Sequence, residues 1–456
     1  MKLHITGGRL VLPPQTAPGA SNPGIPSLGL PAADGTVRAD LFAADGRIVA
    51  IGAAPQGFAA DRTLNAAGLT VAPGLIDLCA RMPTGSAALA RELHAALAGG
   101  ITSLVCPPDL ETTLDTVDAV EMLGLSAHRQ GGARVYPLGA LTRGLAGTAL
   151  AELARLAEAG CVGFSQAEAA LSDTQVLLNA LDYAATFGLP VWLRAQDPHL
   201  SRGAVAASGA VAARLGLAGI PAAAEAIALQ TLLTLVRETG ARLHVQQISS
   251  AEGLALMRAA KREGLPVSCD VNMHHVHLID ADIGFFDSDY KLLPPLRGDR
   301  DRDAIRGGLA DGTIDAICSG HAVIAPERKR LPFGEAAPGA SGLELLLSLT
   351  LKWAQDARVP LARAFERIGA GPAACLGLDG TGGSLCGALH GAKAPIARIE
   401  VGAVADLCLF DAGAYWTVDP DTLHSAGRNT PFAGYELPGP VRITVVGGVP
   451  VYEHEL

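Results

Sequence analysis

The chain is poor in the features that nucleic-acid-binding and membrane-spanning proteins share. Aromatic residues make up only 4% of its 456 residues, and 35 basic against 45 acidic residues give a formal net charge of -10. Phosphate backbones bind clustered Lys and Arg, and bases stack on aromatic rings, so we expect no nucleic acid partner. No apolar run approaches the roughly 18 residues that span a bilayer, so we expect no membrane partner.

Cysteines are few and irregularly spaced. The eight cysteines include no C-x-x-C pair, which is typical of reduced thiols. The first residues, Met1 to Gly8, lack the apolar stretch of a secretory signal and favour an opening strand. We therefore expect a cytoplasmic protein.

Eight short apolar runs alternate with helical stretches through the middle of the chain. Continuous apolar runs are typical of strands that are buried on both faces. They are residues 75–78, 102–106, 134–138, 161–164, 191–193, 243–248, 267–271 and 314–318. This alternation predicts a parallel (β/α)8 TIM barrel over residues 73–397, and a doubly wound open sheet is the structural alternative.

Both ends of the chain are rich in short strands punctuated by Gly. This pattern occurs in residues 3–12 and 46–52 and again in residues 405–411 and 441–452. Two such ends around a different middle predict one small β-sandwich domain built from residues 1–72 and 398–456.

The first predicted barrel strand ends in Pro73-Gly-Leu-Ile-Asp-Leu-Cys-Ala-Arg-Met-Pro83. This segment resembles the P-G-x-x-D-x-H-x-H-x-R signature of dihydroorotases, hydantoinases and allantoinases. The resemblance implies two histidines that bind a metal ion, and Cys79 and Arg81 stand in their places. A thiol binds zinc, but a guanidinium has no lone pair to offer.

Other strand ends resemble further motifs of the same proteins. Cys106-Pro-Pro-Asp109 resembles M-P-N-T, residues 193–197 resemble H-C-E-D, residues 244–249 resemble H-V-x-H-x-S, and residues 318–324 resemble T-D-H-A-P-H. The family's six metal and catalytic positions then fall on Cys79, Arg81, Gln166, Arg194, Gln247 and Gly320. Its substrate-binding positions fall on Pro83, Pro108 and Ile324. None of the first six is His, Asp, Glu or Lys, and two are cations that would repel zinc.

The resemblance covers essentially the whole chain and fits dihydroorotases best. It implies a family that uses two zinc ions, and some bacteria carry non-catalytic members as subunits of an aspartate transcarbamoylase complex. We therefore predict that the chain is not an enzyme and binds no metal cofactor. Its expected role is a structural or assembly subunit for the aspartate transcarbamoylase catalytic chain in pyrimidine biosynthesis, and we also expect a homo-oligomer.

Two other functions remain open. The first is an active cyclic-amide hydrolase of the dihydroorotase, hydantoinase or allantoinase type with altered or metal-independent chemistry. The second is a small-ligand sensor that uses the remaining pocket. Co-purification with a transcarbamoylase separates the assembly role from both.

The remaining polar groups of the predicted mouth have structural interpretations. We expect structural or surface roles for His244, His274, His275, His277 and His321. A zinc site made by Cys79, Cys106, Cys161 and Cys318 is an alternative to buried thiols that fill space. We expect Arg81 and Arg194 to pair with Asp77, Asp197 or Asp270 and to replace metal ions as the positive centre of the barrel mouth. A pocket for a small anion is the alternative.

Overall fold

Short parallel strands form a barrel in the order in which they occur along the chain. The computed structural model describes residues 1–12, 34–379 and 395–454. The barrel strands are β6 (Leu75–Asp77), β8 (Ile101–Cys106), β9 (Arg134–Ala140), β10 (Gly163–Ser165), β11 (Val191–Arg194), β14 (Leu243–Gln246), β15 (Val267–Asn272) and β16 (Ala316–Cys318). Each pairs with its neighbour in this order, which confirms the predicted TIM barrel.

The ring is completed at its carboxyl end by two short strands. Strand β7 (Ala80–Arg81) continues from β6 and β17 (His321–Ala322) continues from β16, and the two pair in parallel. This pairing brings the segment of Arg81 beside the segment of Gly320. Strand ends that carry reactive groups in TIM barrels therefore meet on one face.

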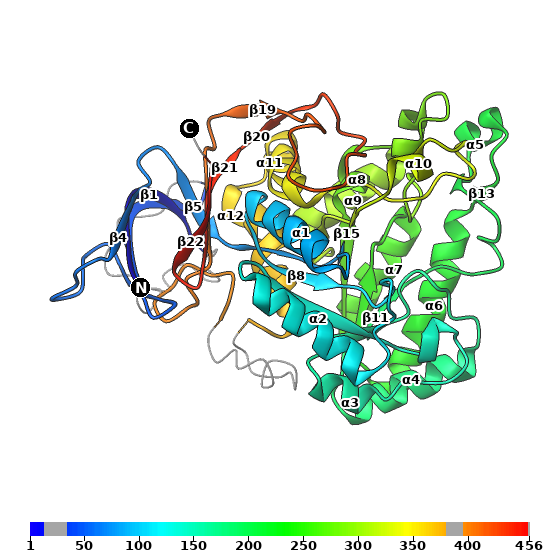
Figure 1. Ribbon diagram of the computed structural model, residues 1–456. Coiled ribbons are helices and arrows are strands. Elements are labelled where there is room, and N and C mark those ends of the chain that lie inside the picture. The colour runs from blue at the N-terminus through cyan, green and yellow to red at the C-terminus, as the bar shows by residue number, and fades with distance from the viewer. Residues whose placement is uncertain (13–33, 380–394, 455–456) are drawn as a thin grey trace.

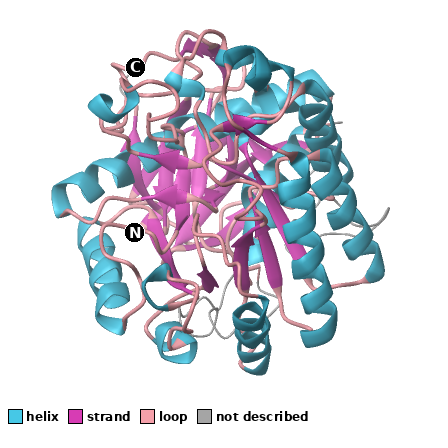
Figure 2. Ribbon diagram, turned by 90° about the vertical axis from the view of Figure 1, so that its right-hand side faces the viewer, coloured by secondary structure: helices cyan, strands magenta, loops and turns pink. Residues whose placement is uncertain are grey.

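Helices surround the barrel, as Figure 2 shows. They are α1 (Ser86–Ala98), α2 (Val117–Gln130), α3 (Leu153–Glu158), α4 (Thr174–Thr186), α5 (Ala210–Leu215), α6 (Ala222–Thr239), α7 (Ala251–Glu263), α8 (Met273–His277), α9 (Asp299–Asp311), α10 (Pro326–Lys329), α11 (Leu346–Ala357), α12 (Leu361–Phe365) and α13 (Gly371–Leu376). The side chains of Thr116, Asp173 and Ser250 cap α2, α4 and α7 by accepting first-turn backbone N–H groups. None of the helices in the described ranges is both long and apolar enough to cross a bilayer.

A second sheet combines the two ends of the chain. Its strands are β1 (Lys2–Val11), β2 (Thr36–Ala44), β3 (Arg47–Ile51), β4 (Arg62–Asn65), β5 (Thr70–Pro73), β18 (Leu407–Phe410), β21 (Val441–Val446) and β22 (Val449–Glu453). Strand β5 pairs with β1 on one side and with β18 on the other, so it joins the N-terminal and C-terminal halves. Figure 1 shows both termini on this β-rich domain, beside the barrel. The boundaries at residues 72/73 and 397/398 stay predictions.

Two further strand pairs lie outside the barrel and the β-rich sheet. Strands β12 (Ala206–Ala207) and β13 (Gly219–Ile220) pair in parallel, and β19 (Tyr415–Thr417) pairs with β20 (Glu436–Pro438). A separate buried cluster includes Leu138 and Trp192 of the barrel strands and Val162, which directly precedes β10. The β-rich domain has a separate apolar core.

A buried carboxylate connects the two domains. Asp406, which is 2% exposed and precedes β18, forms an ion pair with Arg134 at the start of β9. Its Oδ1 also accepts hydrogen bonds from Arg134 Nη2 at 3.2 Å and from the Gly447 backbone N–H at 2.7 Å. One carboxylate therefore satisfies donors from the barrel and from the β-rich sheet.

We expect Asp406→Ala to destabilise the protein by about 1–3 kcal/mol, because it leaves the Arg134 guanidinium and the Gly447 amide without their acceptor. Arg134 is partly exposed, so the loss is smaller than for a fully buried pair. Urea denaturation followed by circular dichroism measures the effect. Glu263→Ala, which breaks the exposed pair with Arg237, is the control and should leave the midpoint nearly unchanged. Equal midpoints for wild type and Asp406→Ala would contradict the assignment.

Candidate barrel-mouth site

The six degenerate positions, where the resemblance places the family's metal and catalytic residues, all lie at the carboxyl end of the barrel. Each belongs to a strand end or to the residues that directly follow it, as the family register requires. They are Cys79 after β6, Arg81 in β7, Gln166 after β10, Arg194 at the end of β11, Gln247 after β14 and Gly320 between β16 and β17.

Arg81 is held by two carboxylates. Its Nη2 lies 2.9 Å from Asp109 Oδ2 and 2.9 Å from Glu168 Oε1, and its Nε donates to Asp109 Oδ2 at 3.2 Å. Burial opposes the charge, but Glu168 and Asp109 outweigh it and raise the pKa of Arg81. The guanidinium is therefore a fixed positive charge at the barrel mouth.

Arg194 is bonded differently. Its Nη2 donates to the backbone carbonyl of Glu168 at 3.2 Å, while Nη1 is buried and has no hydrogen-bond partner among the described residues. Burial lowers the pKa of Arg194, because the charged form is poorly solvated there. Glu168 thus contacts both arginines, through its carboxylate and through its carbonyl.

The two glutamines and the cysteine bond to protein groups. Gln166 Oε1 accepts from Thr142 Oγ1 at 2.9 Å, and Gln166 Nε2 donates to the Leu145 carbonyl at 2.8 Å. Gln247 Nε2 donates to Cys79 Sγ at 3.3 Å. This contact joins the segment after β14 to the segment after β6, and these two strands are not neighbours in the barrel.

Gly320 has a backbone conformation that a side chain would strain. Its φ is +59°, and a Cβ there would lie 2.0 Å from Asn272 Nδ2. Asn272 itself accepts the His274 backbone N–H and so caps α8. An aspartate at position 320, where the family has one, would require Asn272 and the start of α8 to move.

The acidic partners that we predicted for the arginines are engaged elsewhere. Asp77 accepts from Ser319 N–H at 2.9 Å, and Asp270 accepts from Gln247 N–H at 2.6 Å and contacts His244. Asp197 accepts the backbone N–H groups of the two residues that follow Pro198. The prediction of these partners was wrong, because short strand-end carboxylates satisfy nearby backbone donors first.

Two functional residues were missing from the sequence interpretation. Asp109 and Glu168 follow β8 and β10, so their side chains reach the same mouth as Arg81. Asp109 was visible in the Cys106-Pro-Pro-Asp109 segment, where a carboxylate three residues beyond a strand end can pair with an arginine. Glu168 lies in a loop, and the sequence carries no comparable signal for its position.

The histidines of the barrel are buried, or partly buried in the case of His277, and they contact protein atoms. His275 Nε2 contacts the Pro294 carbonyl at 3.1 Å, and His277 Nε2 contacts the Leu349 carbonyl at 2.9 Å. Burial lowers the pKa of each to about 4. His244 contacts Asp270 at 3.0 Å, and His321 contacts Glu92 at 3.1 Å.

The residues at the mouth do not fit a divalent metal ion. Zinc needs thiolate, neutral imidazole or carboxylate donors, and burial raises the pKa of the Cys79 thiol far above neutrality. Arg81 and Arg194 are cations, both amide groups of the glutamines are engaged, and Gly320 has no donor. No group of three or more His, Cys, Asp or Glu residues suited to a metal occurs in the described parts of the chain.

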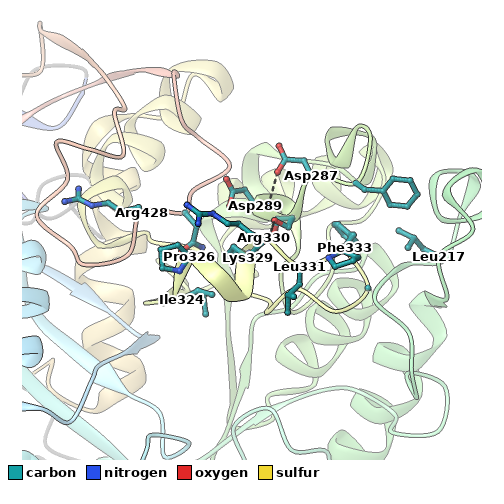
Figure 3. A pocket seen from close by; sticks show the side chains of 15 residues that line it. Leu217, Asp287, Asp289, Ile324, Pro326, Lys329, Arg330, Leu331, Phe333 and Arg428 are labelled. Atoms are coloured by element: carbon teal, nitrogen blue, oxygen red, sulfur yellow. Dashed lines mark hydrogen bonds between the residues drawn. The ribbon is translucent and has the colours of Figure 1, made fainter.

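Two cavities adjoin the strand ends. A cavity of about 110 Å³ lies beside Arg194 and Gln166, against α4 and α6. A wider pocket of about 1010 Å³ lies next to Ile324 and is shown in Figure 3, where Leu217 and Arg428 mark its opposite ends. Burial lowers the pKa of Lys329 in its wall to about 8. Of the predicted substrate positions, Ile324 therefore lines a pocket, Pro83 is half-buried and Pro108 is buried.

Known proteins resemble this chain along most of its length. A family model described as dihydro-orotase-like matches residues 68–253. A dihydroorotase-like protein of Pseudomonas aeruginosa is 42% identical over 92% of this chain and 96% of its own. A dihydroorotase of Anaeromyxobacter sp. (strain K) is 38% identical over 86% of this chain and 88% of its own. The solved L-hydantoinase (dihydropyrimidinase) from Arthrobacter aurescens, 24% identical, has the same fold with a TM-score of 0.81 over 99% of this chain and 96% of its own.

These comparisons contradict the prediction that the chain is not an enzyme. Relatives 38% identical to it carry the name dihydroorotase, which points to a hydrolase. The prediction equated the loss of metal donors with the loss of chemistry. The substitutions remove one way of activating a water molecule, but they leave charged groups in the same place. The missing metal donors therefore do not establish that the chain lacks activity.

We expect Gly320→Ala to cost at least about 3 kcal/mol of stability, because it combines left-handed backbone strain with a clash against Asn272. Gly216→Ala is a matched control, since Gly216 has a φ of +65° but open space around its Cβ position, and it should cost about 1–2 kcal/mol. Urea denaturation of both variants separates strain from contact. Equal losses would show that Asn272 does not restrict position 320.

Acid should destabilise the fold through His275 and His277. A lowered folded-state pKa favours the neutral imidazole. Each histidine therefore makes its full contribution to the free energy of unfolding above pH 6.5, and this contribution declines as the pH falls towards 4. Between pH 7.5 and 5 we expect a loss of roughly 2 kcal/mol for each residue. The double variant His275→Gln, His277→Gln keeps an N–H donor without titrating, and should flatten the pH dependence of the urea midpoint. An unchanged pH dependence would contradict this assignment.

Proposed function

This chain belongs to the dihydroorotase-like family of the amidohydrolase superfamily, and on that basis we propose that it acts in pyrimidine biosynthesis on carbamoyl-aspartate and its cyclic amide, dihydroorotate. A TIM barrel alone supports many reactions, so the fold does not carry this proposal. Its support is the 38% identity to a protein named dihydroorotase over 86% of the chain.

We propose that this reaction proceeds without the two zinc ions that the family resemblance implies. The support is the donor chemistry at the mouth, where cations occupy two of the six positions. Arg81 instead supplies positive charge that is held in place by Asp109 and Glu168. Fixed donors of this kind stabilise an amide oxygen as it becomes negative.

Asp109 is the proton acceptor in this proposal. Its Oδ2 binds Arg81, while its buried Oδ1 has no hydrogen-bond partner among the described residues. In the hydrolytic direction, Asp109 takes a proton from water as the water oxygen bonds to the ring amide carbon. The C–N bond then breaks and the proton passes to the departing nitrogen.

We also propose that the chain assembles with the aspartate transcarbamoylase catalytic chain and with copies of itself. The support is the resemblance to dihydroorotase-like subunits of such complexes, together with an exposed apolar tip. Phe285 is 90% exposed and its neighbour Phe286 is 38% exposed, and the two rings pack edge to face. Exposed aromatic side chains are enriched at protein interfaces.

The reaction is tested with the full-length chain, by following carbamoyl-aspartate cyclisation and dihydroorotate hydrolysis with and without purified aspartate transcarbamoylase. We expect turnover that survives EDTA and falls about 10²–10⁴-fold in Asp109→Asn. Asp118→Asn, at an exposed position in α2, is the matched control and should retain full activity. Size-exclusion chromatography with light scattering reports the assembly in the same samples.

No turnover under either condition would refute the proposed reaction. Turnover that requires one or two zinc ions per chain, measured by metal analysis, would refute the metal-independent route. Separate elution of the two proteins would refute the partnership.

A further inference from the structure

The small cavity beside β11 combines one partly buried cation with walls of mixed polarity. It has a volume of about 110 Å³ and lies between α4, α6 and the segments after β10 and β11. Its apolar lining includes Leu171, Leu177, Leu193, Ile227 and Leu232. Its polar lining comprises Gln166, Ser172, Thr174, Arg194, Gln196, Asp197, His199 and Thr231. We propose that this cavity binds the carboxylate of a small organic acid, with Arg194 as its anchor.

Arg194 has donors that the protein leaves unused. A guanidinium has five N–H donors, and the described residues accept one hydrogen bond from it, through the Glu168 carbonyl. Its Nη1 is buried without a partner. A buried donor without an acceptor costs free energy, and a bound anion would recover it.

The nearby carboxylates are already engaged. Asp109 and the Glu168 side chain bind Arg81, so Arg194 receives no ion pair from the described residues. Asp197, which also lines the cavity, accepts the backbone N–H groups of His199 and Leu200 at 2.9 and 2.8 Å. Asp197 and Glu168 lie near Arg194, but neither carboxylate forms an ion pair with it among the described residues, so its guanidinium can pair with a bound anion.

The surroundings select the class of ligand. A planar carboxylate matches a guanidinium through two parallel hydrogen bonds. A dianion such as phosphate would bring a second charge near Glu168 and Asp197 with no cation to balance it. The aliphatic side chains on one part of the wall favour a short aliphatic chain behind the carboxylate. The expected ligand is therefore a monocarboxylate of about four carbons.

The proposed carboxylate site is independent of the reaction proposed above, because Arg194 takes no part in that reaction. Isothermal titration calorimetry of sodium butyrate into the full-length chain, at constant ionic strength, tests it without reference to turnover. We expect one saturable site, with butanol and inorganic phosphate binding at least tenfold more weakly. Failure of the cyclisation assay would not affect this result, and failure of butyrate binding would not affect the assay.

Three variants locate the site. Arg194→Met removes the charge and should weaken butyrate binding at least tenfold. Ala228→Leu fills the cavity from α6 while keeping Arg194, and should have the same effect, which keeps the test open if Arg194→Met does not fold. Arg214→Met, at an exposed arginine in α5, should bind like wild type. The proposal is overturned by no saturable binding in wild type, by equal binding of phosphate, or by unchanged binding in either Arg194→Met or Ala228→Leu.

Discussion

The contact of Arg81 with Asp109 and Glu168 is the interaction on which the barrel mouth depends. A barrel of this kind directs eight strand ends at one small volume, and polar groups there must be satisfied by each other, by water or by a bound ion. In this chain a guanidinium and two carboxylates satisfy one another across β7, β8 and β10. The Arg81 guanidinium, which is part of the polypeptide, thus carries a positive charge where a bound metal ion would otherwise provide one.

Several neighbouring features follow from that arrangement. Because Arg81 engages both carboxylates, Arg194 keeps unused donors beside a cavity. The Gln247 amide faces the Cys79 thiol and not a cation, and Gly320 allows Asn272 to fill the space next to it. The charge of Arg81 is therefore balanced by two carboxylates, while Arg194 has no ion pair among the described residues.

The architecture could be predicted from the sequence, but the side-chain contacts at the barrel mouth could not. Strand ends such as Arg194 and Gln247 could be placed because eight apolar runs alternate with helices and their register matches a known motif. Side-chain partners depend on loop paths, and Glu168 reaches Arg81 only because the segment after β10 turns back over the mouth. The same motif register identified the lost metal donors, but it could not decide which reaction the remaining groups perform.

The most direct test of this account is a double-mutant cycle on stability that combines Arg81→Met and Asp109→Asn. If the two side chains form the cluster described, each single variant already removes the Arg81–Asp109 contact, and the double variant is less destabilised than the sum by at least about 1 kcal/mol. Additive effects would contradict the account, because they would show that Arg81 and Asp109 do not interact at the barrel mouth.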